Sequence, residues 1–421
     1  MFEKELVCPK CNKNYKLNSW LDDNCGYRLR IKYDKESRKN SVSKDKIKSK
    51  PISHWKYKNF FPVKDDKNII SIGEGGTSLV KSNRISEDFG LNQLYFKLEL
   101  TNPSGSFKDR PISVGASVGK EQNTKVLSAA SSGNAAASLA SFGAKAGINT
   151  VVFVPNRSSQ SKVSQLITLG ATVVRVSPRE NQEGDPSVQL FQESVKKWGW
   201  TPCPSFGPFN PFQFEGTKSL GFEIVEQLDW VVPDWIICNT GSGGLLSGTY
   251  EGFKDWHELH WIEKLPRMVA VQPEACAPVV KAFHDRVKPL EFEAWQGFPE
   301  TVAGGLADPH PWDGDSALEA LYESKGNAMT VNDHQILEYQ RILASKEGIF
   351  AEPSGVAALA GLKLLIDEGT IDKNDLVVVP ITGHGLKDPQ VLQDRYSEAI
   401  VSPPDINVLE TKLKGKNKKL F

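Results

Sequence analysis

From about residue 68 onward, short β-branched runs alternate with alanine-rich stretches, and this pattern constrains the fold more than any other feature of the chain. The three runs of strand length are 125–130, 149–155 and 171–177. The stretches between them, 134–147 and 159–170, have helical composition and end on glycine, which commonly terminates helices. Strands and helices in this order predict a parallel sheet with helices on both faces.

A second series of apolar runs follows in "DWIICN", "RMVAVQP" and "DLVVVP". A chain of 421 residues is also too long for one ordinary core. We therefore predict an α/β protein with two domains, and a ligand in the crevice at the carboxyl ends of their strands.

Charge and hydropathy exclude several classes of protein. The 51 Lys and Arg residues balance the 51 Asp and Glu residues, which argues against a protein that neutralises a nucleic-acid backbone. No apolar run approaches the roughly 18 residues of a membrane span, and the first ten residues lack the apolar stretch of a signal peptide. We expect a soluble, cytoplasmic protein whose partner is a small molecule, with no nucleic-acid or membrane partner.

Two stretches rich in lysine and arginine are expected to lie outside the core. Residues 32–58 carry ten Lys or Arg and three acidic residues, and short charge runs of this kind are usually solvated linkers. The closing stretch, 412–421, is predicted to be a frayed tail.

Three of the six cysteines are grouped near the start of the chain, at Cys8, Cys11 and Cys25. They resemble a zinc ribbon, in which two knuckles each present two thiolates to a tetrahedral ion. The position that pairs with the third cysteine at the same spacing is Asp22, a carboxylate in place of a thiolate. Two interpretations stay open, a zinc site or a relic ribbon that folds by packing Trp20 and Leu21.

A glycine-rich turn follows the predicted strand in "WIIC". It runs from Thr240 to Gly244 and leads into the helical "LLSGTYEGF". Glycines let consecutive backbone N–H groups converge on an anion, and the helix adds its positive N-terminal end. The spacing matches neither a Walker loop nor the dinucleotide fingerprint. The turn therefore predicts a cradle for the phosphate of another cofactor.

A lysine follows a Ser-Gly-Ser turn in "NPSGSFKDRP", residues 102–111. A lysine at one strand-to-helix turn and a phosphate cradle at another together indicate pyridoxal phosphate, whose aldehyde bonds to a lysine amine.

Seven segments resemble, in this order and at comparable spacing, the threonine synthases of the tryptophan-synthase-β-like pyridoxal phosphate fold. They are "NPSGSFKDR", "SSGNAAAS", "NPFQFEGTKSLGFEIVEQL", "VPDWIICNTGSGG", "LPRMVAVQPEACAP", "EGIFAEPSGVAALAGL" and "TGHGLKD". The resemblance covers roughly residues 68 to 390, and "SFKDR" with "TGHGLKD" is its most discriminating pair. Ribbon-like cysteines also precede the catalytic domains of some threonine synthases.

The resemblance implies a domain organisation. The expected parts are a ribbon-like module at 1–30, a linker at 31–67, a large cofactor-binding domain at 68–101 plus 211–398, a small domain at 102–210, and a basic tail at 399–421.

The resemblance also implies roles for single residues. Lys108 would carry the cofactor as a Schiff base and transfer protons, and burial against Phe107 would keep its amine partly deprotonated. Asn134 would donate to the ring oxygen of the cofactor, and Thr382 would face the pyridine nitrogen. The phosphate would be held by Gly241, Ser242, Gly243, Gly244 and Leu245. The substrate carboxylate would be received by the backbone of Ser131, Ser132 and Gly133.

The chain departs from the family pattern at two positions. Pro111 stands where threonine synthases usually have glycine, a harmless change just inside a helix. Gln213 stands where they usually have arginine, and glutamine offers one neutral amide where arginine clamps a phosphate through two charge-assisted bonds. If Gln213 faces the leaving group, the cations expected to hold that anion are Arg110, Lys162 and Lys218.

The activity implied by the resemblance is a lyase reaction that converts O-phospho-L-homoserine and water to L-threonine and phosphate, in an expected homodimer. One alternative is β-replacement on O-phosphoserine, as in the cysteate synthases, against which "NPSGSFKDR" weighs. Another is a catalytically silent homologue with a binding or regulatory role, which the retained lysine, asparagine, glycine turn and threonine disfavour.

Overall fold

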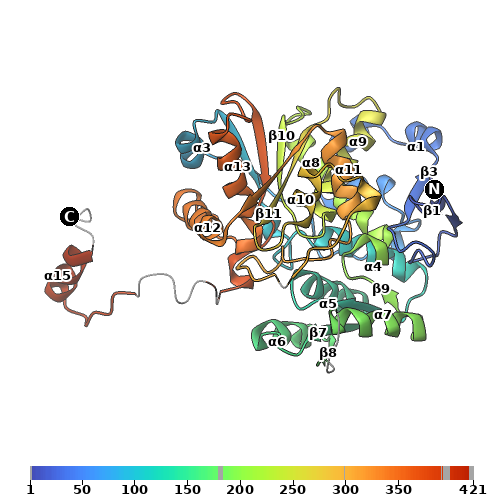
Figure 1. The fold of residues 1–421 in the computed structure, drawn as a ribbon, viewed down its shortest axis with the longest axis horizontal. Helices are drawn as coiled ribbons and strands as arrows, with labels where there is room; N and C mark the ends of the chain where they lie inside the picture. The colour runs from blue at the N-terminus through green and yellow to red at the C-terminus, as the bar shows by residue number, and fades with distance from the viewer. Residues whose placement is uncertain (1, 179–183, 298, 390, 392–398, 417–421) are drawn as a thin grey trace. The chain divides into compact units, whose positions relative to one another are not determined.

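The computed structural model describes residues 2–178, 184–297, 299–389, 391 and 399–416 (Figure 1). The chain divides into two compact units, one ending at Lys387 and the other beginning at Asp388. Among the described residues, no helix combines the length and the apolar character that a membrane crossing requires.

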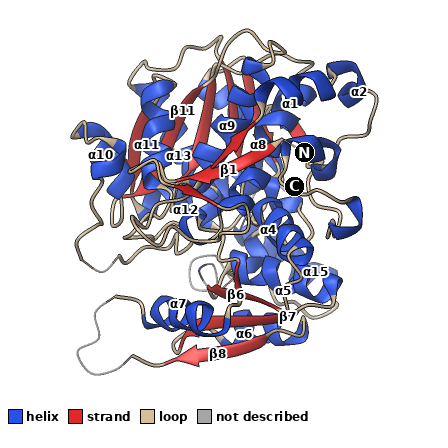
Figure 2. Cartoon of the chain, turned by 90° about the vertical axis from the view of Figure 1, so that its right-hand side faces the viewer, coloured by secondary structure: helices blue, strands red, loops and turns tan. Residues whose placement is uncertain are grey.

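The larger sheet of the first unit has six strands in the order β12-β11-β10-β13-β5-β4. Figure 2 shows this sheet, marked by β11, among the helices that pack around it. The strands are β4 (Leu79–Lys81), β5 (Gln93–Lys97), β10 (Trp235–Asn239), β11 (Arg267–Pro273), β12 (Asn327–Val331) and β13 (Leu376–Pro380). All neighbouring pairs are parallel except β4 with β5, which form an antiparallel edge. The predicted α/β fold with a parallel-rich sheet is confirmed.

Helices cover both faces of this sheet because successive strand residues point to opposite sides. Ile236 and Cys238 of β10 pack into one apolar cluster, whereas Trp235 and Ile237 pack into another. The first face is covered by α8 (Pro211–Gln227), α9 (Gly244–Glu258), α10 (Pro278–His284) and α11 (Gly314–Glu323). The second is covered by α3 (Arg84–Phe89), α12 (Asp333–Glu347) and α13 (Ala357–Asp367).

The smaller sheet has four parallel strands in the order β8-β7-β6-β9. Its strands are β6 (Val126–Ala130), β7 (Asn149–Pro155), β8 (Thr172–Val176) and β9 (Thr201–Pro202). Its helices are α4 (Asp109–Glu121), α5 (Asn134–Ala146), α6 (Gln160–Thr168) and α7 (Pro186–Trp198). The strands and helices predicted between 125 and 177 are present within a residue or two of their expected ends.

The N-terminal module is a small antiparallel sheet, β2-β1-β3, made of β1 (Glu3–Val7), β2 (Asn14–Tyr15) and β3 (Arg30–Tyr33). Trp20 packs edge-on against Phe212 at a centroid distance of 5.3 Å, as the interpretation of the module as a relic ribbon expected. Leu21 does not pack in this way and is 37% exposed.

The segment predicted to be a solvated linker is folded, and that prediction is wrong. It contains α1 (Lys35–Ser41), α2 (Lys44–Lys48), and the 3-10 helices η1 (His54–Phe60) and η2 (Asp66–Asn68). Arg38 donates to Asp255 at 2.6 Å, and both side chains are buried. Tyr57 and Phe60 are buried against Phe222. Most lysines of the segment are exposed, whereas Lys56 is buried and pairs with Glu226, and the aromatic side of the segment faces the core.

The second unit contains α15 (Ile406–Lys416), so the first part of the expected frayed tail is helical. Residues 417–421 of that tail lie outside the described residues. The division of residues 68–387 into a large and a small domain stays a prediction, because both sheets belong to one compact unit that includes the N-terminal module.

A buried ion network joins α4 to the larger sheet. Arg110, which has no exposed surface, donates to Glu99 at 2.6 and 2.7 Å and to Glu223 at 2.8 Å from two of its nitrogens. It also donates to Ser219 at 2.9 Å, and Lys97 donates to Glu223 at 2.7 Å. Two cations thus balance two carboxylates, which buried charges require.

Removing one partner from this network should destabilise the protein. In Arg110→Met, the Glu99 and Glu223 carboxylates stay buried without their guanidinium, at an expected cost of about 3–5 kcal/mol of unfolding free energy. The exposed Arg341→Met variant is the matched control and should change stability by less than about 0.5 kcal/mol. Guanidinium unfolding curves measure both, and equal midpoints for Arg110→Met and the wild type would contradict a stabilising role.

Candidate functional site

Lys108 immediately precedes α4, in a turn held by the segment that follows β13. Ser106 forms a bridge with Gly383, and the Phe107 N–H donates to the Thr382 carbonyl at 3.0 Å. The His384 N–H donates back to the same turn, to a carbonyl 2.9 Å away. The structure therefore brings together the two most discriminating motifs, "SFKDR" and "TGHGLKD", and with them Lys108 and Thr382.

The amine of Lys108 lies in a partly apolar environment. Its Nζ is 4.7 Å from the centre of the Phe107 ring. Burial lowers the pKa of Lys108 to about 8, while the negative charges of Asp313 and Asp308 act in the opposite direction. A substantial fraction of the amine is therefore neutral near physiological pH, as a nucleophile or a proton-transfer base requires.

The predicted phosphate cradle lies between β10 and α9. Gly243 has a φ of +99°, and a Cβ on it would lie 2.7 Å from the Asp313 carbonyl oxygen, so the position requires glycine. A Cβ on Gly241 would lie 3.0 Å from another carbonyl oxygen, that of Gly305. The first N–H groups of α9, from Gly244 onward, have no partner within the helix and are available to an anion.

Two carboxyls beside this cradle carry no sequence motif and were not predicted. Asp313 accepts from the Gly207 N–H at 3.2 Å, and burial raises its pKa to about 6. Burial also raises the pKa of Asp308 to about 7. Carboxylates repel a phosphate, and the raised pKa values limit this repulsion because a fraction of each carboxyl stays neutral.

Arg28 of the N-terminal module also reaches this region. Its Nε lies 3.6 Å from Asp313 Oδ1, its Nη2 donates to Ser316 at 2.9 Å, and its guanidinium lies 3.5 Å from the centre of the Phe214 ring. Arg28 lies 212 residues before the start of the glycine-rich turn at Thr240 and belongs to no motif, so only the structure identifies it.

The residues predicted to bind the cofactor and the substrate carboxylate lie at the start of α5. They are connected to the Thr382 loop through Glu352. Asn134 donates from Nδ2 to Glu352 Oε1 at 2.7 Å, and the Glu352 N–H donates to the Gly383 carbonyl at 3.0 Å. The turn before Asn134 is supported by a bond of 3.2 Å from the Gly133 N–H to the Ser131 hydroxyl. The segment of Ser131, Ser132 and Gly133 thus adjoins the loop that carries Thr382. Glu352 lies in the motif "EGIFAEPSGVAALAGL", where no local pattern distinguishes it from its neighbours.

Two of the three cations expected to hold the leaving group have structural roles instead. Arg110 donates from all three guanidinium nitrogens to buried protein oxygens. Lys218 is buried between Glu215 at 2.7 Å and Asp255 at 3.3 Å. Arg110 has no N–H left for a substrate anion, and two of the three N–H groups of Lys218 face these carboxylates in a buried position.

Gln213 is buried and contacts the backbone of Phe206, so it supports the loop before α8. Lys162 lies in α6 and is partly exposed. Its charge acts on Lys387, whose pKa is lowered by burial first and by Lys162 in addition. Lys387 donates to the Ser104 carbonyl at 2.9 Å, beside the turn of Lys108.

Comparison with known proteins agrees with this arrangement. A family profile described as "Pyridoxal-phosphate dependent enzyme" matches residues 70–383. The threonine synthase of Methanocaldococcus jannaschii is 38% identical over 97% of this chain and 98% of its own length. That of Methanosarcina acetivorans is 36% identical over 98% and 99%.

Solved structures share the fold. The processed form of threonine deaminase isoform 2 from Solanum lycopersicum superimposes with a TM-score of 0.65 at 20% identity, over 85% of this chain and 95% of that one. Maize serine racemase gives a TM-score of 0.63 at 21% identity, over 76% and 91%.

The lowered pKa of Lys108 predicts unusual reactivity in cofactor-free protein. Only the neutral amine is acylated, so competitive labelling with acetic anhydride should reach half its maximum near pH 8 at Lys108, against about 10.4 for an ordinary lysine. Asp313→Asn removes a negative charge that favours the ammonium form, so its midpoint should fall further. A midpoint near 10 in the wild type, read by peptide mass spectrometry, would contradict the assigned environment.

Proposed function

The chain belongs to the pyridoxal-phosphate dependent enzyme family, and we propose that it acts as a threonine synthase. This lyase converts O-phospho-L-homoserine and water into L-threonine and phosphate. The observation that carries the proposal is the match to threonine synthases over nearly the full length of the chain, with the "SFKDR" lysine held against the "TGHGLKD" loop.

The residues present fit pyridoxal phosphate. Lys108 offers a partly deprotonated amine, and Gly243 shapes a turn at a helix N-terminus that suits a phosphate. We assign Gly241, Ser242, Gly244 and Leu245 to the same phosphate, as the sequence predicts. When bound, the cofactor supplies an aldehyde for the lysine and a ring that accepts electrons from bonds broken at the substrate.

We assign the proton transfers of the reaction to Lys108. With a pKa of about 8, its amine both takes up and returns a proton near neutral pH, as removal of protons at Cα and Cβ requires. Loss of the γ-phosphate and addition of water at Cβ then complete the conversion, in which one water is consumed and one phosphate released. Thr382 and Asn134 are proposed to orient the cofactor beside this amine.

The substrate carries two anionic ends, which the site must separate. We assign the carboxylate to the backbone of Ser131, Ser132 and Gly133, at the N-terminus of α5. Because Arg110 and Lys218 are engaged by protein carboxylates, we assign the leaving phosphate to Lys162 and Lys387. If Lys162 and Lys387 bind the leaving phosphate, glutamine at position 213 in place of the usual arginine removes no ligand of that phosphate.

β-Replacement on O-phosphoserine is the less favoured activity, because the near full-length relatives are threonine synthases and "NPSGSFKDR" has the threonine synthase form. Assembly as a homodimer and a cytoplasmic location remain predictions from the sequence.

A direct assay separates the two activities. Purified enzyme with pyridoxal phosphate should release phosphate and form threonine from O-phospho-L-homoserine, and should give little product from O-phosphoserine with sulfite. Lys108→Ala should lower kcat by at least about 10³-fold, whereas the exposed Lys125→Ala should retain activity.

Turnover of O-phosphoserine with sulfite alone would show that the enzyme performs β-replacement. An active Lys108→Ala variant would remove Lys108 from the mechanism.

A further inference from the structure

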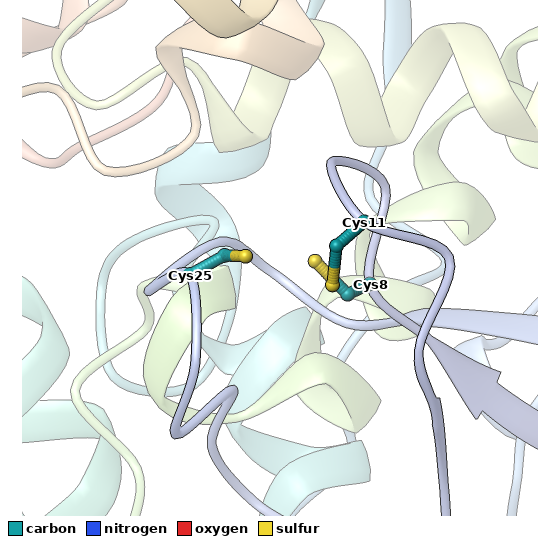
Figure 3. A group of neighbouring side chains, drawn as sticks. All are labelled: Cys8, Cys11 and Cys25. Atoms are coloured by element: carbon teal, nitrogen blue, oxygen red, sulfur yellow. The ribbon is translucent and has the colours of Figure 1, made fainter.

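The ribbon-like cysteines converge at one end of the N-terminal sheet. Cys8 follows β1, Cys11 lies in the next turn, and Cys25 lies in the loop before β3. Figure 3 shows the sulfur atom of Cys25 directed toward those of Cys8 and Cys11. All three sulfur atoms lie within 4.8 Å of one another. Tetrahedral zinc with Zn–S bonds of about 2.3 Å separates its sulfur ligands by about 3.8 Å, so the three thiols are close to the spacing of a metal site.

N–H donors surround these sulfur atoms. The backbone N–H groups of Lys10 and Cys11 point to the Cys8 sulfur, and that of Lys13 points to the Cys11 sulfur. The side-chain amide of Asn24 lies 3.6 Å from the Cys11 sulfur and 3.3 Å from the Cys25 sulfur. Donors of this kind stabilise thiolates that coordinate a metal.

Asp22 lies beside this cluster, where its carboxylate interacts with the Cys8 thiol. It lies three residues before Cys25, which repeats the spacing from Cys8 to Cys11. Its Oδ1 accepts from the Tyr15 hydroxyl at 2.6 Å and from the N–H groups of Asn24 and Cys25 at 3.0 and 3.1 Å. Its Oδ2 is buried and has no hydrogen-bond partner in the described part of the chain. An unpaired buried carboxylate oxygen is costly unless a cation completes it.

We propose that the N-terminal module binds one zinc ion through the thiolates of Cys8, Cys11 and Cys25 and through Oδ2 of Asp22. Binding converts three thiols to thiolates and releases three protons. The four ligands carry four negative charges against the two of the ion, and Lys10 and Lys13 lie in the same loop. The four positions are filled by protein ligands, as in structural zinc sites.

The ion would also support the cofactor region. Only two residues separate Cys25 from Arg28, which contacts Asp313 beside the glycine turn. Zinc held by Cys25 fixes the start of this segment, and β3 fixes its end. The metal thereby limits the positions available to Arg28.

The zinc content of the purified protein tests the proposed zinc site. Protein expressed with zinc and purified under reducing conditions should contain about one zinc per chain by elemental analysis. Cys11→Ser, which changes an exposed side chain, should reduce this to below about a tenth, whereas Cys203→Ser, at a buried cysteine outside the cluster, should keep it. Wild-type protein that takes up no zinc from added ZnCl₂, or Cys11→Ser with unchanged content, would overturn the proposal.

Cobalt substitution tests the fourth ligand. Wild-type protein loaded with CoCl₂ should show the intense visible bands of tetrahedral Co²⁺ with thiolate charge transfer. Asp22→Asn should weaken zinc affinity at least about tenfold and change these bands. Asp22→Cys should retain the metal and increase the charge-transfer absorbance by about a third, because four thiolates replace three. An unchanged affinity and spectrum in Asp22→Asn would exclude the carboxylate as a ligand.

Discussion

The position of the reactive lysine depends on the buried charge cluster directly behind it. Arg110 is two residues from Lys108, and its guanidinium is bonded to carboxylates from two other elements, Glu99 in η3 (Glu99–Thr101) and Glu223 in α8. Although burial opposes ionisation, the charges of Arg110 and Lys97 hold the pKa of Glu223 well below its usual range. The cluster thus stays ionised, and the bonds of Arg110 hold the first turn of α4 against η3 and α8. Lys108 is presented from that fixed start.

The residues of this cluster also show which features of the site can be predicted from the sequence and which cannot. "SFKDR" identified the lysine because a local motif carries its own geometry, and the strands were found because β-branched runs and glycine-terminated helices are local signals as well. Arg110 and Lys218 were expected to face the substrate because each is a cation near a motif. Charge alone does not show whether the donors of a side chain are already engaged. Buried carboxylates engage them in both cases, those of Glu99 and Glu223 for Arg110 and those of Glu215 and Asp255 for Lys218.

Several contacts of the site could not be predicted because they join residues that lie far apart in the sequence. Arg28 and Asp313 meet beside the glycine turn although 285 positions separate them, and Glu352 reaches Asn134 across a separation of 218 residues. The folded segment 31–67 was missed for a related reason. Its composition is that of a linker, but Tyr57 and Phe60 are buried against α8 and α9 while most of its lysines are exposed.

The central claim is that Lys108 is the residue that carries the cofactor. Borohydride reduction of the enzyme loaded with pyridoxal phosphate, followed by proteolysis and peptide mass spectrometry, identifies that lysine directly. We predict a pyridoxyl group on Lys108 in the peptide that contains "SFKDR". A label on Lys387, or on any other lysine with Lys108 unmodified, would contradict the account.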